Sequence, residues 1–311
     1  MDLRGRRVAL ALGGGGARGC AHIGAIAELE DRGAEIVAIA GTSMGAIVGG
    51  MYAAGQLGPY QEWLEGLTRR DVIRMLDPAL RSPGMIGAEK IMARVRELIG
   101  DTRIEDLPMP FTAVATELLT GKEVWFQHGS LERAIRASIA IPSVITPLVE
   151  GGRVLVDGGL VDLVPVMPLA SAKADLIVAV SVIGTPRGVV GPSSLRSESL
   201  EPVQGDSVQQ RDQDIVRRIM SRLGWDSAEA VEPQAAEVLD LPVNLRTLDV
   251  MELSIQTMQR MITRLQMASF PPDVFIELPT DICGTMEFHR AREVAELGRA
   301  RTKAVLDASE D

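Results

Sequence analysis

The chain has 311 residues, 46% of them hydrophobic and 24% charged, so it can bury a sizeable core and is not globally disordered. Its formal net charge of −10 argues against a nucleic-acid partner held through phosphate contacts. The two cysteines, Cys20 and Cys283, are too few for a disulfide framework and form no CxxC metal pair. We therefore expect a cytoplasmic globular protein without a metal site.

One uncharged stretch is long enough to cross a bilayer. Residues 36–58 carry no charge, but they include six glycines and a Thr-Ser pair. The stretch divides naturally into a strand, a tight turn and a helix. We therefore predict that it forms buried core, and we expect no transmembrane helix.

The first half of the chain alternates apolar runs with helical periodicity. The predicted elements are strands at Arg7–Leu12 and Glu35–Ala40, helices at Ala21–Arg32 and Met44–Ala54, a broken helical region at 60–100, and a hairpin of Phe111–Thr116 with Glu123–Gln127. Strand, loop and helix repeated twice within about fifty residues is typical of a right-handed βαβ unit. The expected fold class is therefore α/β with a mainly parallel sheet.

The second half continues this pattern and contains a change in composition. The predicted elements are helices at Leu131–Ala140, Leu245–Phe270 and Glu287–Ala308, and strands at Arg153–Val156, Asp175–Ile183 and Val274–Leu278. Residues 186–235 are rich in Ser, Pro, Gln and charge, which predicts a polar, partly flexible insertion. We expect a single domain over 1–311, with a core of 7–185 plus 240–311.

The insertion contains one segment with helical periodicity, residues 212–225. Arginines lie beside its apolar face, and a Trp follows. This pattern is typical of a helix packed on the domain, and also of a lid or a helix that lies at a lipid interface.

The strongest chemical signal is Gly41-Thr42-Ser43-Met44-Gly45, a G-x-S-x-G pattern between a predicted strand and a predicted helix. This is the setting of a nucleophile elbow, in which Gly41 and Gly45 lack side chains so that a sharp turn can lift Ser43 above the sheet. Ser43 would then lie near a helix N-terminus, whose free N–H groups favour negative charge. The alternative is a glycine-rich turn with an N-capping serine. The strand-turn-helix setting favours a catalytic Ser43.

A second glycine-rich junction precedes the first helix, Gly13-Gly14-Gly15-Gly16-Ala17-Arg18-Gly19. Its successive glycines leave backbone N–H groups open to a bound oxygen, as an oxyanion hole requires. Gly14, Gly16 and Gly19 also fit the dinucleotide fingerprint, but that site needs an acidic residue where the second strand ends. This chain has the elbow there instead. A nucleotide site is therefore the weaker interpretation, and we expect no organic cofactor.

The third motif is Asp157-Gly158-Gly159, which follows a predicted strand. An aspartate at a strand end can face an active site, with the glycines freeing its backbone. Taken alone, however, the motif is better explained as a hairpin turn, which Asp-Gly favours.

A serine nucleophile normally needs a base, and histidines are scarce here. His22 lies in the first predicted helix, His128 in a loop and His289 in the charged terminal helix. Only His289 has the chain order of an α/β-hydrolase histidine, and its surroundings are not those of a catalytic loop. The sequence therefore favours a two-residue device, with Asp157 accepting the proton of Ser43.

Together, the three motifs resemble those of the patatin-like phospholipase family, which combines a G-G-G-x-[RK]-G loop, a G-x-S-x-G elbow and a D-G-[GA] motif in this order. Residues 137–142, Ala-Ser-Ile-Ala-Ile-Pro, also resemble the family's helix-to-proline segment before its aspartate. The similarity spans residues 7–185. Among relatives, it is greatest to bacterial members near the catalytic domain of neuropathy target esterase.

The resemblance implies a three-layer α/β/α fold and a Ser-Asp dyad hydrolase of lipid esters, of the lysophospholipase, phospholipase A or carboxylesterase type. Ser43 would be the nucleophile, Asp157 the general base, and the loop from Gly14 to Gly19 the oxyanion hole. Within that loop, Arg18 would steady the backbone or meet a lipid phosphate. An acyltransferase with the same dyad and a low-activity regulatory protein that keeps the fold are the alternatives.

The expected partners follow from this chemistry. They are a lipid ester and, transiently, a membrane or micelle surface, which would allow a peripheral position at the inner membrane. The sequence does not determine the oligomeric state, and a homodimer is one of the states it allows.

Overall fold

The computed structural model describes residues 1–75, 89–142, 144–186 and 247–309. Most of them belong to one compact unit, Met1–Arg187 with Met251–Asp311. A second unit, Gly188–Val250, lies almost entirely outside the described residues. The predicted interfacial segment 212–225 and the predicted helix break near residues 78–83 fall outside them too.

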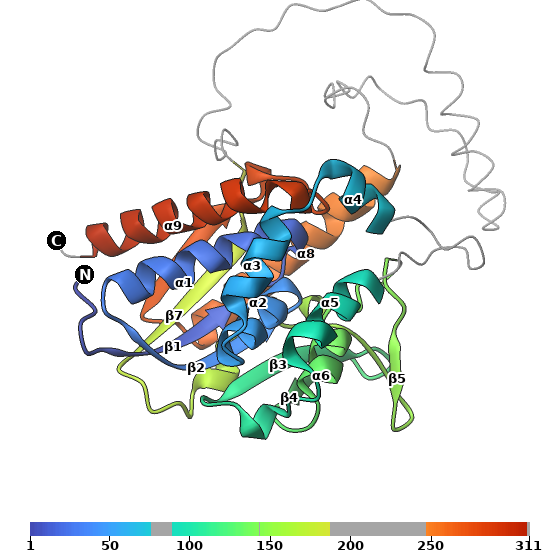
Figure 1. Ribbon diagram of the computed structural model, residues 1–311, viewed down its shortest axis with the longest axis horizontal. Coiled ribbons are helices and arrows are strands. Elements are labelled where there is room, and N and C mark those ends of the chain that lie inside the picture. Colours follow the sequence, from blue (N-terminus) through green and yellow to red (C-terminus); the bar gives the residue numbers. More distant parts are fainter. Residues whose placement is uncertain (76–88, 143, 187–246, 310–311) are drawn as a thin grey trace, which may run out of the picture. The chain divides into compact units, whose positions relative to one another are not determined.

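The compact unit is built on an eight-stranded sheet with the order β5-β6-β3-β2-β1-β7-β8, in which β4 also pairs with β3 (Figure 1). Neighbours from β3 to β8 along this order are parallel, whereas β4, β5 and β6 form antiparallel pairs. The strands are β1 (Arg7–Leu12), β2 (Glu35–Thr42), β3 (Phe111–Glu117), β4 (Lys122–Phe126), β5 (Leu148–Glu150), β6 (Arg153–Asp157), β7 (Leu176–Gly184) and β8 (Val274–Pro279).

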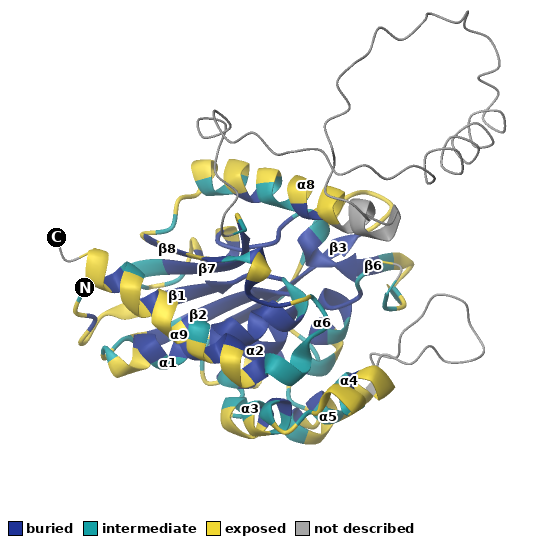
Figure 2. Ribbon diagram, turned by 90° about the horizontal axis from the view of Figure 1, so that it is seen from above, coloured by how far each residue is buried: buried dark blue, intermediate teal, exposed yellow. Residues whose placement is uncertain are grey.

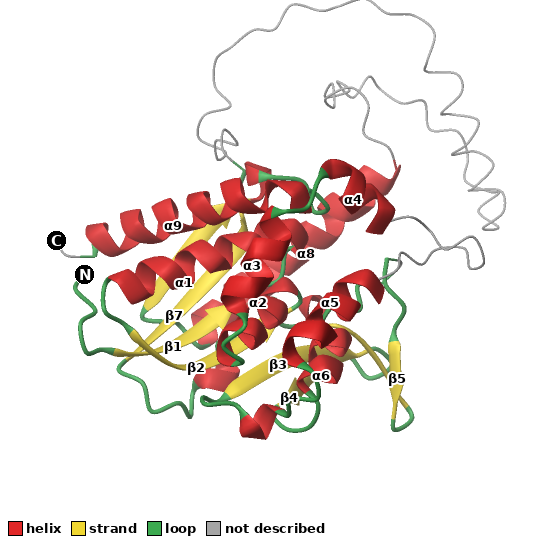
Figure 3. Cartoon of the chain, viewed as in Figure 1, coloured by secondary structure: helices red, strands yellow, loops and turns green. Residues whose placement is uncertain are grey.

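Helices cover both faces of this sheet (Figure 3). They are α1 (Ala21–Asp31), α2 (Met44–Ala53), α3 (Leu57–Glu65), α4 (Arg69–Met75), α5 (Glu89–Ile99), α6 (Leu131–Ser138), α8 (Thr247–Ser269) and α9 (Ala291–Ala308). Short 3-10 turns lie at Gly16–Cys20, Ile104–Asp106, Gly158–Leu160, Met167–Leu169, Thr280–Ile282 and Phe288–Arg290. Helices α1, α2, α6 and α9 lie on one face, and α8 lies on the other (Figures 1 and 2). The predicted α/β fold class, three layers with a mainly parallel sheet, is confirmed.

The alternation along β1 shows why the two faces differ. Val8, Leu10 and Leu12 point into the large core beneath α1, α2 and α9. Ala9 and Ala11 point the other way, into a smaller core with residues 164–169 and Met267 of α8. Because side chains alternate along a strand, large residues meet the helix layer and alanines let the opposite segment approach closely.

Three details differ from the expectations. Asp157-Gly158-Gly159 does not form a hairpin, because Asp157 ends β6 and caps a 3-10 turn. The hairpin at this edge of the sheet joins β5, which was not predicted, to β6. The terminal helix α9 begins at Ala291, so His289 lies in the 3-10 turn before it. No helix among the described residues is long and apolar enough to span a membrane.

Candidate active site

Two strands that run in opposite directions end at neighbouring positions along β3. The parallel strand β2 ends at Thr42, which pairs with Val114, and the antiparallel strand β6 ends at Asp157, which pairs with Ala115. Since β4 occupies the other edge of β3, β2 and β6 meet end to end along one edge. This topology brings the residue after Thr42, which is Ser43, beside Asp157.

Ser43 has the backbone geometry of a nucleophile elbow. It has φ 56° and ψ −122°, and it is the only non-glycine residue with positive φ in the described part of the chain. A side chain at Gly41 would collide with the backbone of Gly45, and one at Gly45 with the backbone of Leu12. Both elbow glycines are therefore required by close packing, as the motif predicts.

The turn is held by a residue that the motifs did not single out, Ser138 at the end of α6. The Ser43 N–H donates to Ser138 Oγ over 2.9 Å, and Ser138 Oγ–H donates to the carbonyl of Val114 over 2.6 Å. Two residues further on, the Ala140 carbonyl accepts from the Asp157 N–H over 2.9 Å. The segment at 137–142 thus fixes the backbone of both predicted dyad residues, and its place before the aspartate motif was the only sequence signal for this role.

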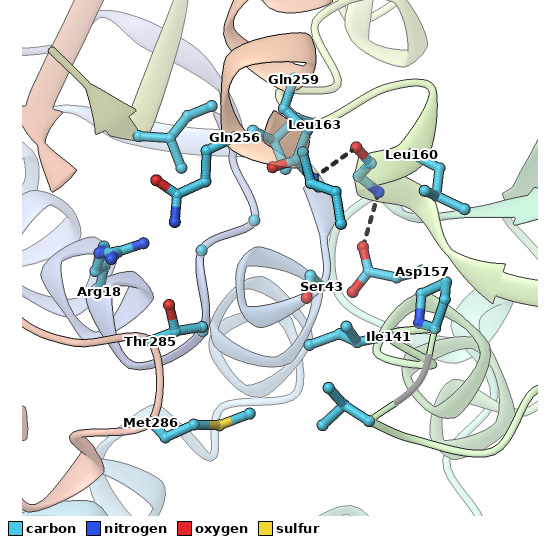
Figure 4. Close-up of a pocket in the computed structure, with 18 residues that line it drawn as sticks. Arg18, Ser43, Ile141, Asp157, Leu160, Leu163, Gln256, Gln259, Thr285 and Met286 are labelled. Carbon is cyan, nitrogen blue, oxygen red and sulfur yellow. Dashed lines mark hydrogen bonds between the residues drawn. The ribbon is translucent and has the colours of Figure 1, made fainter. Parts of the chain in front are cut away.

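Asp157 is buried, with 6% of its surface exposed. Its Oδ1 accepts from the Gly159 N–H over 2.7 Å. Its buried Oδ2 has no hydrogen-bond partner among the described residues. Figure 4 shows the Ser43 hydroxyl next to this carboxyl group. Burial raises the pKa of Asp157 to about 6, although the Ser43 hydroxyl and the Gly159 N–H both act to lower it. A carboxyl group with this pKa is ionised near neutral pH and still basic enough to accept a proton.

The glycine loop lies on the other side of Ser43. The Gly14 N–H is occupied by the carbonyl of Leu163 at 3.0 Å, whereas no hydrogen bond is formed by the N–H groups of Gly15 and Gly16 among the described residues. Gly15 and Gly16 are therefore available backbone donors among the predicted oxyanion-hole residues. A Cβ at Gly15 would meet Val182, and one at Gly16 would meet Thr285, so both glycines are also required by packing.

Arg18 lines the cavity and is buried, with 7% of its surface exposed. Its Nε donates to the carbonyl of Cys283 over 2.9 Å, and the neighbouring Ala17 N–H donates to the carbonyl of Thr285 over 2.8 Å. These contacts tie the glycine loop to the segment before α9. Steadying the loop is therefore one role that the Arg18 contacts support.

None of the three histidines lines the cavity that contains Ser43. His22 is fully buried, and its Nε2 lies 2.7 Å from the Gly13 carbonyl, which can only accept, so Nε2 carries the proton. Burial lowers the pKa of His22 to about 4, which keeps the ring neutral as a support of the glycine loop. His128 is exposed and lies at a different hollow.

The cavity has a volume of about 360 Å³ and is lined by all three motifs. Most of the remaining wall is apolar, including Ile141, Leu160, Leu163, Ile183 and Met286. No cluster of three or more His, Cys, Asp or Glu side chains suited to a metal occurs among residues 1–75, 89–142, 144–186 and 247–309.

Helix α8 supplies a second group that the motifs did not reveal, the glutamines Gln256 and Gln259 in the cavity wall. Gln259 Nε2 donates to the Gly159 carbonyl over 2.9 Å, and the Gly159 N–H in turn holds Asp157 (Figure 4). Two turns further along, Gln266 Nε2 donates to the Val161 carbonyl over 2.9 Å. The long helix thus supports the loop that orients the carboxyl group.

Comparisons with known proteins agree with this arrangement. A profile described as patatin-like phospholipase matches residues 10–170, which contain all three motifs. The chain belongs to the patatin-like phospholipase family. An uncharacterised NTE family protein of Mycobacterium tuberculosis is 43% identical to it over 98% of this chain and 92% of its own length. This patatin-like chain is also 28% identical to lysophospholipase nte1 of Emericella nidulans, over 98% of this chain and 18% of that protein. It is 32% identical to patatin-like phospholipase domain-containing protein 6 of Mus musculus, over 58% of this chain and 14% of that protein.

Family membership identifies the chain as an enzyme that hydrolyses lipid esters. The family, the fold class and the enzyme class predicted from the motifs are therefore confirmed. The roles of the individual site residues, the substrate type and the location in the cell stay predictions.

Proposed function

We propose that this chain is a serine acyl hydrolase of the lysophospholipase or carboxylesterase type that works through a Ser43–Asp157 dyad. The observation that carries the proposal is the end-to-end meeting of β2 and β6, which places Ser43 beside a buried carboxyl group in one apolar cavity. The absence of any histidine from the wall of that cavity supports a catalytic dyad rather than a triad.

In the first half of the reaction, Ser43 Oγ attacks the ester carbonyl carbon while its proton moves to Asp157 Oδ2, the oxygen that has no other partner in the described part of the chain. The carbonyl oxygen becomes an oxyanion, which the N–H groups of Gly15 and Gly16 are free to stabilise. Collapse of this intermediate breaks the bond to the leaving alcohol, which takes the proton from Asp157. Ser43 then carries the acyl group as an ester.

In the second half, Asp157 takes a proton from a water molecule, whose oxygen attacks the acyl carbon. The oxyanion forms again against the same loop, and its collapse returns the proton to Ser43 Oγ. A fatty acid leaves, and the enzyme is restored without a metal or an organic cofactor.

The cavity supports a substrate with one acyl chain. Its volume of about 360 Å³ lies at the low end of the range of about 300–1,000 Å³ for small-molecule sites. Its aliphatic wall suits an alkyl chain. A membrane or micelle would be the source of such a lipid.

Fatty-acid release from a lysophospholipid tests the proposal, with Ser43→Ala compared against Ser181→Ala, a buried serine on β7. We expect Ser43→Ala to lose roughly 10⁴-fold or more in turnover and Ser181→Ala to keep most of it. Adding glycerol separates the alternatives. Predominant transfer of the acyl group to glycerol would indicate an acyltransferase, and a well-folded but inert wild type would indicate a regulatory protein.

A further inference from the structure

Helix α8 differs from an ordinary surface helix in which of its side chains face the protein and which face outward. Its inner stripe consists of Gln256 and Thr263, which are buried, and of Gln259 and Gln266, which are half-buried, spaced three and four residues apart. Opposite them, Met258, Met261 and Leu265 are 57%, 54% and 63% exposed. A surface helix normally buries its apolar stripe and exposes its polar one, so this outer face needs an explanation.

The polar inner stripe of α8 is explained by its contacts with the loop beside Asp157 in the candidate active site. Gln259 and Gln266 donate to the carbonyls of Gly159 and Val161, which are backbone acceptors of the loop that orients Asp157. The helix therefore uses its glutamines to hold the catalytic loop. Met267 packs inward against the smaller core, whereas Met258, Met261 and Leu265 face outward. Figure 2 shows α8 on the opposite side of the sheet from α1 and α9, with much of its outer surface exposed.

Exposed apolar side chains are concentrated on this helix. Residues 253–270 include six of the thirteen exposed large apolar side chains in the described part of the chain, Leu253, Ile255, Met258, Met261, Leu265 and Phe270. Ile255 is 42% exposed and also lines the cavity that contains Ser43. The outer face of α8, defined by Ile255, Met258, Met261 and Leu265, is thus continuous with the wall of the active-site cavity.

The charges along this helix favour one kind of partner. Helix α8 has two acidic residues near its start, Asp249 and Glu252, and from residue 253 to its end its only charged residues are Arg260 and Arg264. Both arginines fall on one side of the apolar stripe, at the positions that flank it in a lipid-interfacial helix. Apolar side chains bordered by arginines match the chemistry of an anionic lipid surface.

We propose that the outer face of α8 docks the enzyme onto anionic lipid, so that a single lipid can pass along Ile255 into the cavity. The choice of lipid as the occupant rests on the proposed lipid-ester substrate. A second copy of the chain, or another part of the same chain, is the competing occupant that the experiment must separate.

The experiment measures binding to vesicles by flotation, using phosphatidylcholine with and without an equal part of phosphatidylglycerol. All proteins carry Ser43→Ala, so binding is read without hydrolysis. The test variant is Met258→Gln/Met261→Gln/Leu265→Gln. The matched control is Leu119→Gln/Val149→Gln, whose side chains are 77% and 68% exposed away from α8.

We expect the α8 variant to bind vesicles at least about 30-fold more weakly, with unchanged Tm and oligomeric state, and the control to bind like its parent. Arg260→Gln and Arg264→Gln should each weaken binding to the anionic vesicles by about fivefold, and hardly affect binding to phosphatidylcholine alone.

Four results would overturn the inference. The parent protein could fail to bind vesicles, or the α8 variant could bind as well as the control. The α8 variant could lower Tm by several degrees, which would mean that the chain itself covers this face. Wild type could be a dimer that the variant converts to a monomer, which would assign the face to a second copy. Because binding is measured in Ser43→Ala, a failure of the proposed catalysis would leave these readouts unaffected.

Discussion

Two strand-to-helix junctions border the cavity, and they differ in which residue carries the unusual backbone. After β1, the left-handed conformation falls on a glycine, Gly16 with φ 59°. After β2, it falls on Ser43, with φ 56°. The first junction adopts its shape without strain and offers N–H groups, whereas the second holds a side chain in a conformation that costs about 1–3 kcal/mol. The comparison indicates that the chain accepts strain where a nucleophile is needed and avoids it where backbone donors suffice.

The largest effect should come from removing the reactive group at the strained junction. Ser43→Ala should lower turnover roughly 10⁴- to 10⁶-fold while leaving Tm within a few degrees of wild type, because the methyl group keeps the Cβ and only the hydroxyl is lost. Turnover and thermal unfolding measured on one preparation check this. Retention of most activity would remove Ser43 from the mechanism.

Removing the base should have the next largest effect. Asp157→Asn should lower turnover about 10²- to 10⁴-fold. The matched control is Asp162→Asn, because Asp162 is a buried carboxyl group nearby whose pKa burial and the Glu123 charge raise to about 7. Asp162 lines a different cavity, so its variant should keep most of the turnover. Equal losses in both variants would contradict a specific role for Asp157.

Asp157→Asn should also change the free energy of unfolding, in a direction that follows from the raised pKa of Asp157. Burial raises the pKa of Asp157 to about 6, above the value of 3.8 for a free aspartate, so ionising it disfavours the folded state. The penalty is absent below about pH 4, grows as pH rises to 6, and reaches roughly 3 kcal/mol above that. Asp157→Asn should therefore have a higher Tm than wild type at pH 8, and this gain should shrink on lowering the pH toward 4. A gain independent of pH would contradict the assigned pKa.

The unstrained junction should respond to a side chain in both activity and stability. Gly16→Ala would force φ 59° on a residue with a Cβ and push that Cβ against the Thr285 carbonyl. We expect a loss of about 1–3 kcal/mol in the free energy of unfolding, with about 10²- to 10³-fold in turnover as an oxyanion donor is displaced. Chemical denaturation and turnover measure the two effects. If stability alone falls, the loop has only a structural role.

The smallest effect is expected from Ser43→Gly, which tests directly whether the two junctions differ in backbone strain. Ser43→Gly should raise the free energy of unfolding by about 1 kcal/mol, because glycine tolerates the positive φ that strains the serine. Glycine would thus stabilise one junction, while losing glycine destabilises the other. Denaturant unfolding of Ser43→Gly beside Ser43→Ala checks this, and a Ser43→Gly protein less stable than Ser43→Ala would show that the elbow is unstrained.

The sequence predicted the strands and helices around the site well, because the βαβ unit consists of continuous apolar runs separated by glycine. The three-residue strand β5 was missed, since a strand that short carries no periodicity. Glycine patterns indicated Ser43, Asp157 and the loop, because sharp turns and close approaches demand glycine at fixed spacing. Ser138 belongs to a segment that the resemblance pointed out, but nothing in the sequence showed that its hydroxyl holds the Ser43 N–H. Gln259 lies on a helix far from the motifs in sequence, and only the tertiary fold brings it to the Gly159 carbonyl.

In the proposed mechanism, Ser43 is acylated with Asp157 as its base and with no help from histidine. The most direct measurement is the rate at which a fluorophosphonate modifies the enzyme, followed by peptide mass spectrometry between pH 4.5 and 8. We expect one adduct on Ser43, a rate that rises with an apparent pKa of about 6, and little reaction in Asp157→Asn. His128→Ala and His289→Ala should react like wild type. An adduct at another residue, or a rate that depends on a histidine and not on Asp157, would contradict it.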